Sequence, residues 1–110
     1  MNLIFAALAD PTRRAILERL SRGEATVTEL AEPFDVAQPT ISRHLRVLEE
    51  AGLIRSSQEA QRRPRTLVVG GPLEAVDAWL APFRARWERR FDRLEQFLAD
   101  PKQKKGPPRG

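Results

Sequence analysis

Two helical segments separated by only three residues constrain the fold of this chain more than any other feature of its sequence. Apolar residues recur at helical spacing over residues 27–34 and again over residues 38–51, with residues 35–37 between them. Gly52 follows the second segment as a stop signal. Two short helices joined in this way predict a helix-turn-helix.

Short-range signals mark where the neighbouring helices begin. Thr26 and Glu29 form a T-x-x-E capping box at the start of the first of the two segments. Asp10, which is followed by proline, is a suitable N-cap for an earlier helix over residues 11–21. Residues 3–8 are a further short apolar helix candidate. These signals place two more helices ahead of the helix-turn-helix.

A β-hairpin is predicted after the second segment. Residues 53–56 and 66–69 have the composition of strands, and they flank a polar, arginine-rich stretch over residues 58–65. Such a hairpin with a charged tip is the wing of a winged helix-turn-helix. The predicted fold is therefore mainly α with a small β-hairpin, with five or six helices and a two-stranded wing.

A long apolar seam predicts the last helix, over residues 73–98, and Pro82 inside it predicts a kink or a break between Leu80 and Phe83. We expect one DNA-binding and dimerisation domain over residues 1–99 and a flexible basic tail over residues 100–110. The seam consists of Leu73, Val76, Leu80, Phe83, Trp87, Phe91, Leu94 and Leu98.

Positive charge is concentrated in two parts of the chain. The net charge of the 110 residues is +4, while residues 38–72 alone carry six arginines against three acids and residues 101–110 carry four basic residues and no acid. A localised positive charge favours a polyanionic partner. The first of these blocks coincides with the predicted helix-turn-helix and wing, which points to double-stranded DNA.

The exposed face of the second helix has the side chains needed to read base edges. With the buried stripe centred on Ile41, the opposite face holds arginines that can bond guanine, and Gln38 can pair with adenine. Arginines at the hairpin tip are expected to contact phosphates or the minor groove. The predicted DNA-contacting residues are Gln38, Pro39, Thr40, Ser42, Arg43 and Arg46 on the helix, His44 as a packing or DNA-proximal residue, and Arg62, Arg63 and Arg65 on the wing.

Two strings, ALADPTRRAILERL and TELAEPFDVAQPTISRHLRVLEEAGLI, strongly resemble the ArsR-type family of winged helix regulators, and the resemblance covers nearly all of residues 3–98. It implies a homodimer built from the first and last helices, repression at an operator, and release by a signal. It also implies base contacts from Gln38, Thr40, Ser42 and Arg43, with His44 close by. The chain departs from many relatives at Ala37, where they carry a serine N-cap.

Several other classes of protein are disfavoured. The chain has no cysteine, which excludes disulfides, thiolate metal sites and cysteine nucleophiles. It has no glycine-rich phosphate loop, and Ser42 beside His44 is a pair of sequence neighbours rather than part of a catalytic triad, so we do not expect an enzyme. No apolar run is long enough for a membrane span and the N-terminus lacks the features of a secretory signal, so we expect a cytoplasmic protein.

Many members of the family sense metals, but the residues needed for that are missing. Thr26 and Thr28 stand where thiols would be, and the last helix has no histidine. Scattered acids on that helix could form a carboxylate site across a dimer, but such residues are usually ion-pair partners. We expect no metal and no cofactor. The release signal is then an unknown organic effector near Trp79 and Trp87, a partner protein, or a change in the concentration of the regulator itself. The acids in question are Asp77, Glu88, Asp92 and Glu95.

The apolar seam is longer than the core of the domain requires, so we expect a partner helix to cover it. The sequence thus predicts a homodimeric, sequence-specific DNA-binding repressor that binds a palindromic operator in the major groove. The alternative is a winged helix used only as a protein dimerisation module, which would not need the two basic elements. The expected dimer contacts are Leu3, Ile4, Leu8, Val76, Leu80, Phe83, Trp87, Phe91, Leu94 and Leu98.

Overall fold

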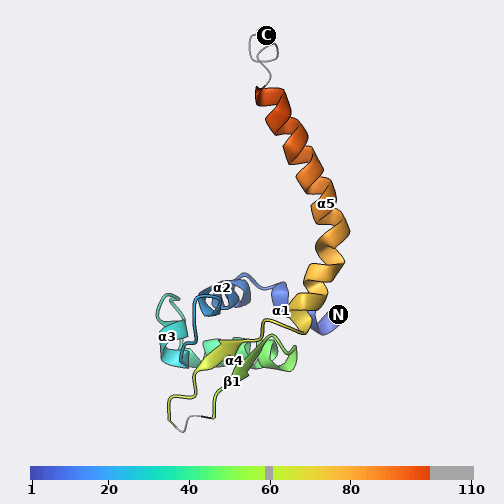
Figure 1. Ribbon diagram of the computed structural model, residues 1–110. Coiled ribbons are helices and arrows are strands. Elements are labelled where there is room, and N and C mark those ends of the chain that lie inside the picture. The colour runs from blue at the N-terminus through green and yellow to red at the C-terminus, as the bar shows by residue number, and fades with distance from the viewer. Residues whose placement is uncertain (59–60, 100–110) are drawn as a thin grey trace. The chain divides into compact units, whose positions relative to one another are not determined.

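The computed structural model describes residues 1–58 and 61–99, and within them it contains five helices and one antiparallel β-hairpin (Figure 1). The predicted fold class is confirmed, with five helices rather than six. The predicted tail, residues 100–110, lies outside the described residues. The elements are α1 (Asn2–Leu8), α2 (Pro11–Leu20), α3 (Val27–Ala31), α4 (Gln38–Glu50), β1 (Ile54–Ser56), β2 (Arg65–Leu67) and α5 (Pro72–Ala99).

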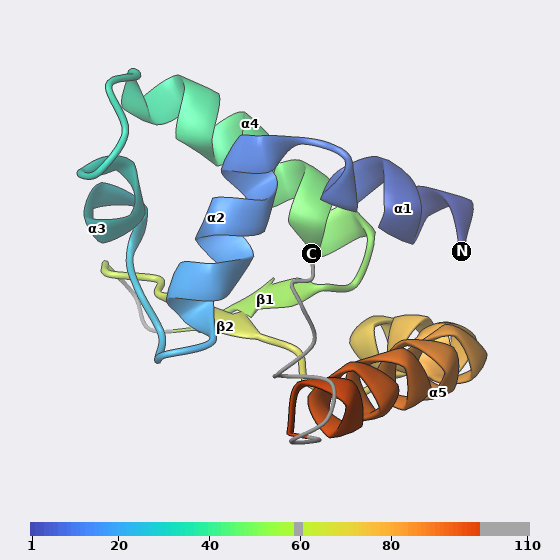
Figure 2. The same cartoon turned by 90° about the horizontal axis from the view of Figure 1, so that it is seen from above.

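The chain divides after Val76 into two compact units, so α5 begins in the first unit and continues in the second. In the first unit, α1, α2, α3 and β1 all pack against α4, and α2 lies across it (Figure 2). The predicted stripe of Ile41, Leu45 and Leu48 is completely buried. Helix α4 is therefore the centre of the core, and its remaining face is exposed.

The predicted caps of α2 and α3 are present. Asp10 Oδ2 accepts a hydrogen bond of 3.0 Å from the backbone N–H of Arg13. Thr26 Oγ1 accepts from the backbone N–H of Glu29 at 3.2 Å, and Glu29 Oε1 accepts from the backbone N–H of Thr26 at 2.9 Å. These bonds satisfy N–H groups that a helix cannot satisfy from within.

Helix α3 is shorter than the sequence predicts. It ends at Ala31 rather than Phe34, so the connection to α4 runs over residues 32–37 and the prediction of a three-residue gap was wrong. Pro33 explains the early end, because it has no N–H to donate to the preceding turn. Phe34 still packs against the core from outside the helix.

The wing is also shorter than predicted. Ile54 pairs with Leu67, and Ser56 pairs with Arg65. Strand β2 begins at Arg65 rather than at residue 66 and ends before Val69, which is 75% exposed. Arg65 also forms a bridge with Ala25, since each backbone N–H donates to the other residue's carbonyl, at 2.7 and 3.1 Å. This long-range pairing fixes where the strand starts.

Helix α5 is continuous through Pro82, so of the two predicted alternatives the break is wrong, and the kink stays a prediction. The proline is exposed, and water can satisfy the one carbonyl that it leaves without a helical partner. Leu73 packs against the core of the first unit, whereas α5 has no buried residue. No helix among the described residues combines the length and the apolar character needed to cross a bilayer.

The capping carboxylates make stability depend on acid pH. The hydrogen bond from the Arg13 backbone N–H lowers the pKa of Asp10, and that from the Thr26 backbone N–H lowers the pKa of Glu29. A carboxylate whose pKa falls on folding contributes stability above its unfolded pKa of about 4, and this contribution is lost as the pH falls through the folded pKa. We expect Asp10→Asn/Glu29→Gln to show a smaller loss of stability below pH about 4 than the wild type. Urea unfolding across this pH range tests it, with the exposed carboxylate substitution Glu50→Gln as control.

Candidate nucleic-acid interface

One face of α4 is exposed and polar, as the sequence predicts. Its buried face is apolar, and the predicted contact residues lie on the other side of the helix. No acid occurs on this helix before Glu49. The exposed residues are Gln38, Pro39, Ser42, Arg43 and Arg46, and Thr40 is half-buried. The α4 reading face, as we call these six residues, thus presents amide, hydroxyl and guanidinium groups to solvent.

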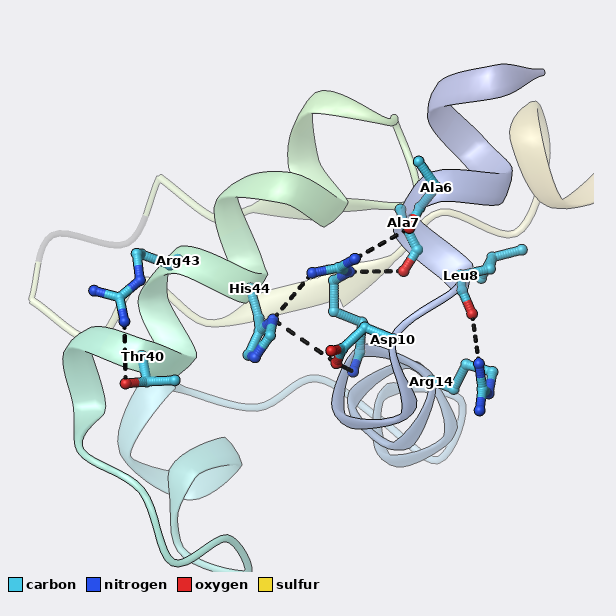
Figure 3. Close-up of polar contacts among 9 residues, drawn as sticks. Ala6, Ala7, Leu8, Asp10, Arg14, Thr40, Arg43 and His44 are labelled. Atoms are coloured by element: carbon cyan, nitrogen blue, oxygen red, sulfur yellow. Dashed lines mark hydrogen bonds and ion pairs between the residues drawn. The ribbon is translucent and has the colours of Figure 1, made fainter.

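Two hydrogen bonds order the start of the α4 reading face. Gln38 Nε2 donates to Thr28 Oγ1 at 3.3 Å, which joins α4 to α3. Arg43 Nη2 donates to Thr40 Oγ1 at 3.3 Å (Figure 3). Because a guanidinium has five N–H donors, Arg43 retains most of them for another partner. The N-cap residue of α4 is Ala37, which makes no side-chain capping bond.

The wing brings two of its three predicted arginines to an exposed turn. Arg62 and Arg63 are exposed, and Arg63 has a positive φ of 43°. Arg65 instead belongs to β2 and is half-buried, so its predicted position at the hairpin tip was wrong. Its Nη1 donates to the carbonyl of Arg63 at 2.8 Å, and its Nε lies 3.8 Å from Glu49 Oε2. A hollow of about 470 Å³ lies between these arginines and the start of α3.

His44 lies outside the α4 reading face, in a polar network with Arg13 and Asp10 that the sequence did not predict. Its Nδ1 is 3.2 Å from Arg13 Nη1 and 4.0 Å from Asp10 Oδ2, and its side chain is 20% exposed (Figure 3). The position of His44 beside the buried stripe indicated partial burial. Its partner Arg13 is 31 residues away in the sequence, and no local pattern signals such a contact.

The second unit presents an apolar surface on α5. Phe83, Trp87, Phe91, Leu94 and Leu98 are between 43% and 65% exposed. Ring centroids lie 5.0 Å apart for Trp79 and Phe83 and 6.5 Å apart for Phe83 and Trp87. Val76 and Leu80, which belong to the same seam, are half-buried. In α1, Leu3 is 68% exposed, while Ile4 and Leu8 pack on the core.

Acidic residues on α5 do not gather into a metal site. Asp77 forms an ion pair with Arg84. Within residues 1–58 and 61–99, no group of three histidine or carboxylate side chains is arranged to hold a metal ion. Asp77 is therefore an ion-pair partner, as predicted for the acidic residues of this helix.

Comparison with known proteins matches this arrangement. A family described as a helix-turn-helix domain matches residues 8–57. The transcriptional repressor SdpR of Bacillus subtilis is 43% identical over 61 residues, which cover 56% of this chain and 68% of SdpR. A crystal structure of the ArsR family transcriptional regulator RHA00566 is 52% identical, with a TM-score of 0.69, covering 79% of this chain and 94% of that one.

A solution structure from Mycobacterium bovis, described as the homodimeric winged helix-turn-helix DNA-binding domain of Mb0332, is 25% identical, with a TM-score of 0.59 over 84% of this chain and 82% of that one. The relatives are transcription regulators and not enzymes. The chain belongs to the ArsR family and is a winged helix-turn-helix, DNA-binding transcription regulator.

Proposed function

We propose that this protein is a homodimeric repressor that binds a palindromic operator, with α4 of each protomer in the major groove. The observation that carries the proposal is the exposed polar side of α4, held outward because Ile41, Leu45 and Leu48 are completely buried on the other side. A dimer with two-fold symmetry presents two such helices, and the operator then has two related half-sites.

The residues of the α4 reading face have separate roles in this proposal. Arg43 and Arg46 bond guanine edges, Gln38 bonds adenine, and small hydroxyl residues contact bases or phosphates. Arg62 and Arg63 contact phosphates or the minor groove from the wing. Arg65, held in β2, and His44 stay predictions as contacts to DNA, since both side chains already have partners within the protein.

Helix α5 supplies the main dimer contacts in the proposal. Its exposed aromatic and leucine side chains form a continuous apolar stripe that a monomer would leave in water. The homodimeric relative from Mycobacterium bovis supports the same assembly here. Residues 1–99 then act as one DNA-binding and dimerising domain. The alternative, a dimerisation module that does not bind DNA, leaves the polar face of α4 without a role.

An organic molecule is proposed as the signal that releases the repressor from DNA. The proposed protein is cytoplasmic and uses neither a metal nor a cofactor. A shallow hollow of about 550 Å³ on α5 is lined by aromatic and aliphatic side chains together with two arginines. These residues are Trp87, Arg90, Phe91, Arg93 and Leu94.

Arg43→Ala and the double variant Arg62→Ala/Arg63→Ala are expected to weaken DNA binding in different ways. Loss of a base-reading arginine costs about 1 to 3 kcal/mol on the operator and little on random DNA, whereas each lost phosphate contact reduces the salt slope by about one unit on both. Fluorescence anisotropy with operator and scrambled duplexes over a range of salt concentrations measures both effects. Arg22→Ala, an exposed change beyond α2, is the control. Equal losses on both duplexes for Arg43→Ala would contradict its role in base reading.

Trp87→Glu/Leu94→Glu is expected to convert the dimer to monomers, because it buries two charges in the proposed interface. Operator affinity should fall with it, since a monomer contacts one half-site only. Ala78→Glu/Ala81→Glu adds the same charge at exposed α5 positions off the apolar stripe and should remain dimeric. Sedimentation equilibrium at micromolar protein distinguishes them, and a monomeric wild type would overturn the proposed assembly.

Operator binding is expected to be indifferent to zinc, cadmium, arsenite and antimonite at low micromolar levels. Thiophilic ions need thiolates, and the chain has neither cysteine nor a second histidine for a borderline ion. Anisotropy titration of the operator complex with each ion, followed by a chelator, is the measurement. A reversible tenfold change in affinity that follows one ion would instead assign a metal site to the carboxylates of α5.

A further inference from the structure

From α2, the side chain of Arg13 bonds to two other helices, α1 and α4, although neither its sequence position nor its place on α2 indicates this. Its Nε donates to the carbonyl of Ala7 at 2.7 Å, and its Nη2 donates to the carbonyl of Ala6 at 3.0 Å. Both carbonyls lie in the last turn of α1. Its Nη1 lies 3.2 Å from Nδ1 of His44 on α4. Figure 3 shows these two carbonyls and His44 converging on the same guanidinium.

The bonds from Arg13 add directional contacts to α1, a short helix whose Ile4 and Leu8 pack on the core. It has seven residues, of which only Ala7 is buried. The last four carbonyls of a helix have no intrahelical partner, and isolated helices of this length are not stable in water. A guanidinium at this end supplies two donors and a charge that suits the helix dipole. The position of the end of α1 is therefore linked to Arg13.

The bond to α4 has a defined direction. A guanidinium only donates, so Nδ1 of His44 accepts and the proton of the neutral ring is on Nε2. Asp10 Oδ2, 4.0 Å from Nδ1, accepts from the backbone N–H of Arg13 and completes the cluster. His44 directly follows Arg43, one of the two arginines of the α4 reading face. A shift of the His44 side chain thus acts on the helical turn that carries Arg43.

We propose that Arg13 is a positioning residue that couples the end of α1 to the α4 reading face, so that operator affinity depends on the Arg13–His44 contact. The planar guanidinium makes all three bonds from one rigid group, and a displacement of α1 therefore strains or breaks the bond to His44. This inference rests on the proposed DNA-binding role of α4. Since α1 is also expected at the dimer interface, the coupling links that interface to DNA binding, and it acts in both directions.

Arg14 provides a matched control for the test. It is the next residue of α2, and its Nη1 donates to the carbonyl of Leu8 at 2.8 Å, again at the end of α1. This bond reaches α1 and not α4. Arg13→Lys and Arg14→Lys both keep the charge and remove the fork, but only the first removes a contact to α4.

The experiment compares operator binding by these variants at protein concentrations where the wild type is fully dimeric. Arg13→Lys should weaken operator binding about tenfold, or about 1.4 kcal/mol, and leave binding to scrambled DNA unchanged. Arg14→Lys should change operator binding less than about twofold. Thermal melting of both variants separates these effects from a general loss of folding.

A double-mutant cycle with His44→Ala identifies the contact itself. His44→Ala keeps the bonds from Arg13 to α1 and should weaken operator binding as Arg13→Lys does, even where Arg13→Lys lowers stability too far to be measured. In the His44→Ala background, Arg13→Lys should have no further effect. His44→Gln, whose amide oxygen can accept from Arg13, should restore part of the affinity.

Equal losses for Arg13→Lys and Arg14→Lys, or additive effects in the cycle, would overturn the coupling. The proposed function itself would be contradicted if the wild-type protein bound no DNA sequence more tightly than scrambled DNA. The two failures are therefore distinguishable.

Discussion

Burial of one side of α4 is the interaction on which the rest of the structure depends. Ile41, Leu45 and Leu48 are completely buried, and four elements of the first unit pack against this helix. Truncation of such a buried leucine to alanine typically costs about 2 to 5 kcal/mol, which is a large share of the stability of a small domain. Because this side is fixed, the opposite one is directed outward without needing any bond of its own. The α4 reading face is thus a consequence of the core, and its side chains stay available to a partner.

What the sequence predicted correctly is local in origin. The caps at Asp10 and Thr26 and the apolar stripe of α4 follow from residues within one or two turns of each other. The errors arise from other causes. Pro33 ends α3 early, although the apolar spacing continues to Phe34. The pairing of Arg65 with Ala25 fixes β2 across 40 residues of chain. Of the kink or break expected at Pro82, the break does not occur, because one proline in an exposed position removes a single bond from a long helix.

Helix α5 differs from the other helices in what holds it. It is 28 residues long and has no buried residue, so little of its stability comes from packing within the described chain. Arg86, Arg89, Arg90 and Arg93 also lie at three- and four-residue steps, where like charges repel by a few tenths of a kcal/mol per pair. Association with a second protomer would cover the apolar stripe that lies beside this row of arginines, and would therefore stabilise the helix. In the proposed dimer, the folding of α5 is thus coupled to dimerisation.

The two sides of α4 differ in the kind of interaction that they make. The core side offers only contact between apolar groups, which resists displacement and transmits no specific signal. The network of Arg13, His44 and Asp10 is polar and half-buried, and its geometry is set by directional bonds that have discrete made and broken states. A bound state of the protein that moves α1 can therefore alter the turn carrying Arg43 without disturbing the stripe that keeps α4 folded. In the proposed coupling, a signal that acts through this network changes how the residues of the α4 reading face are aimed and leaves their identity unchanged.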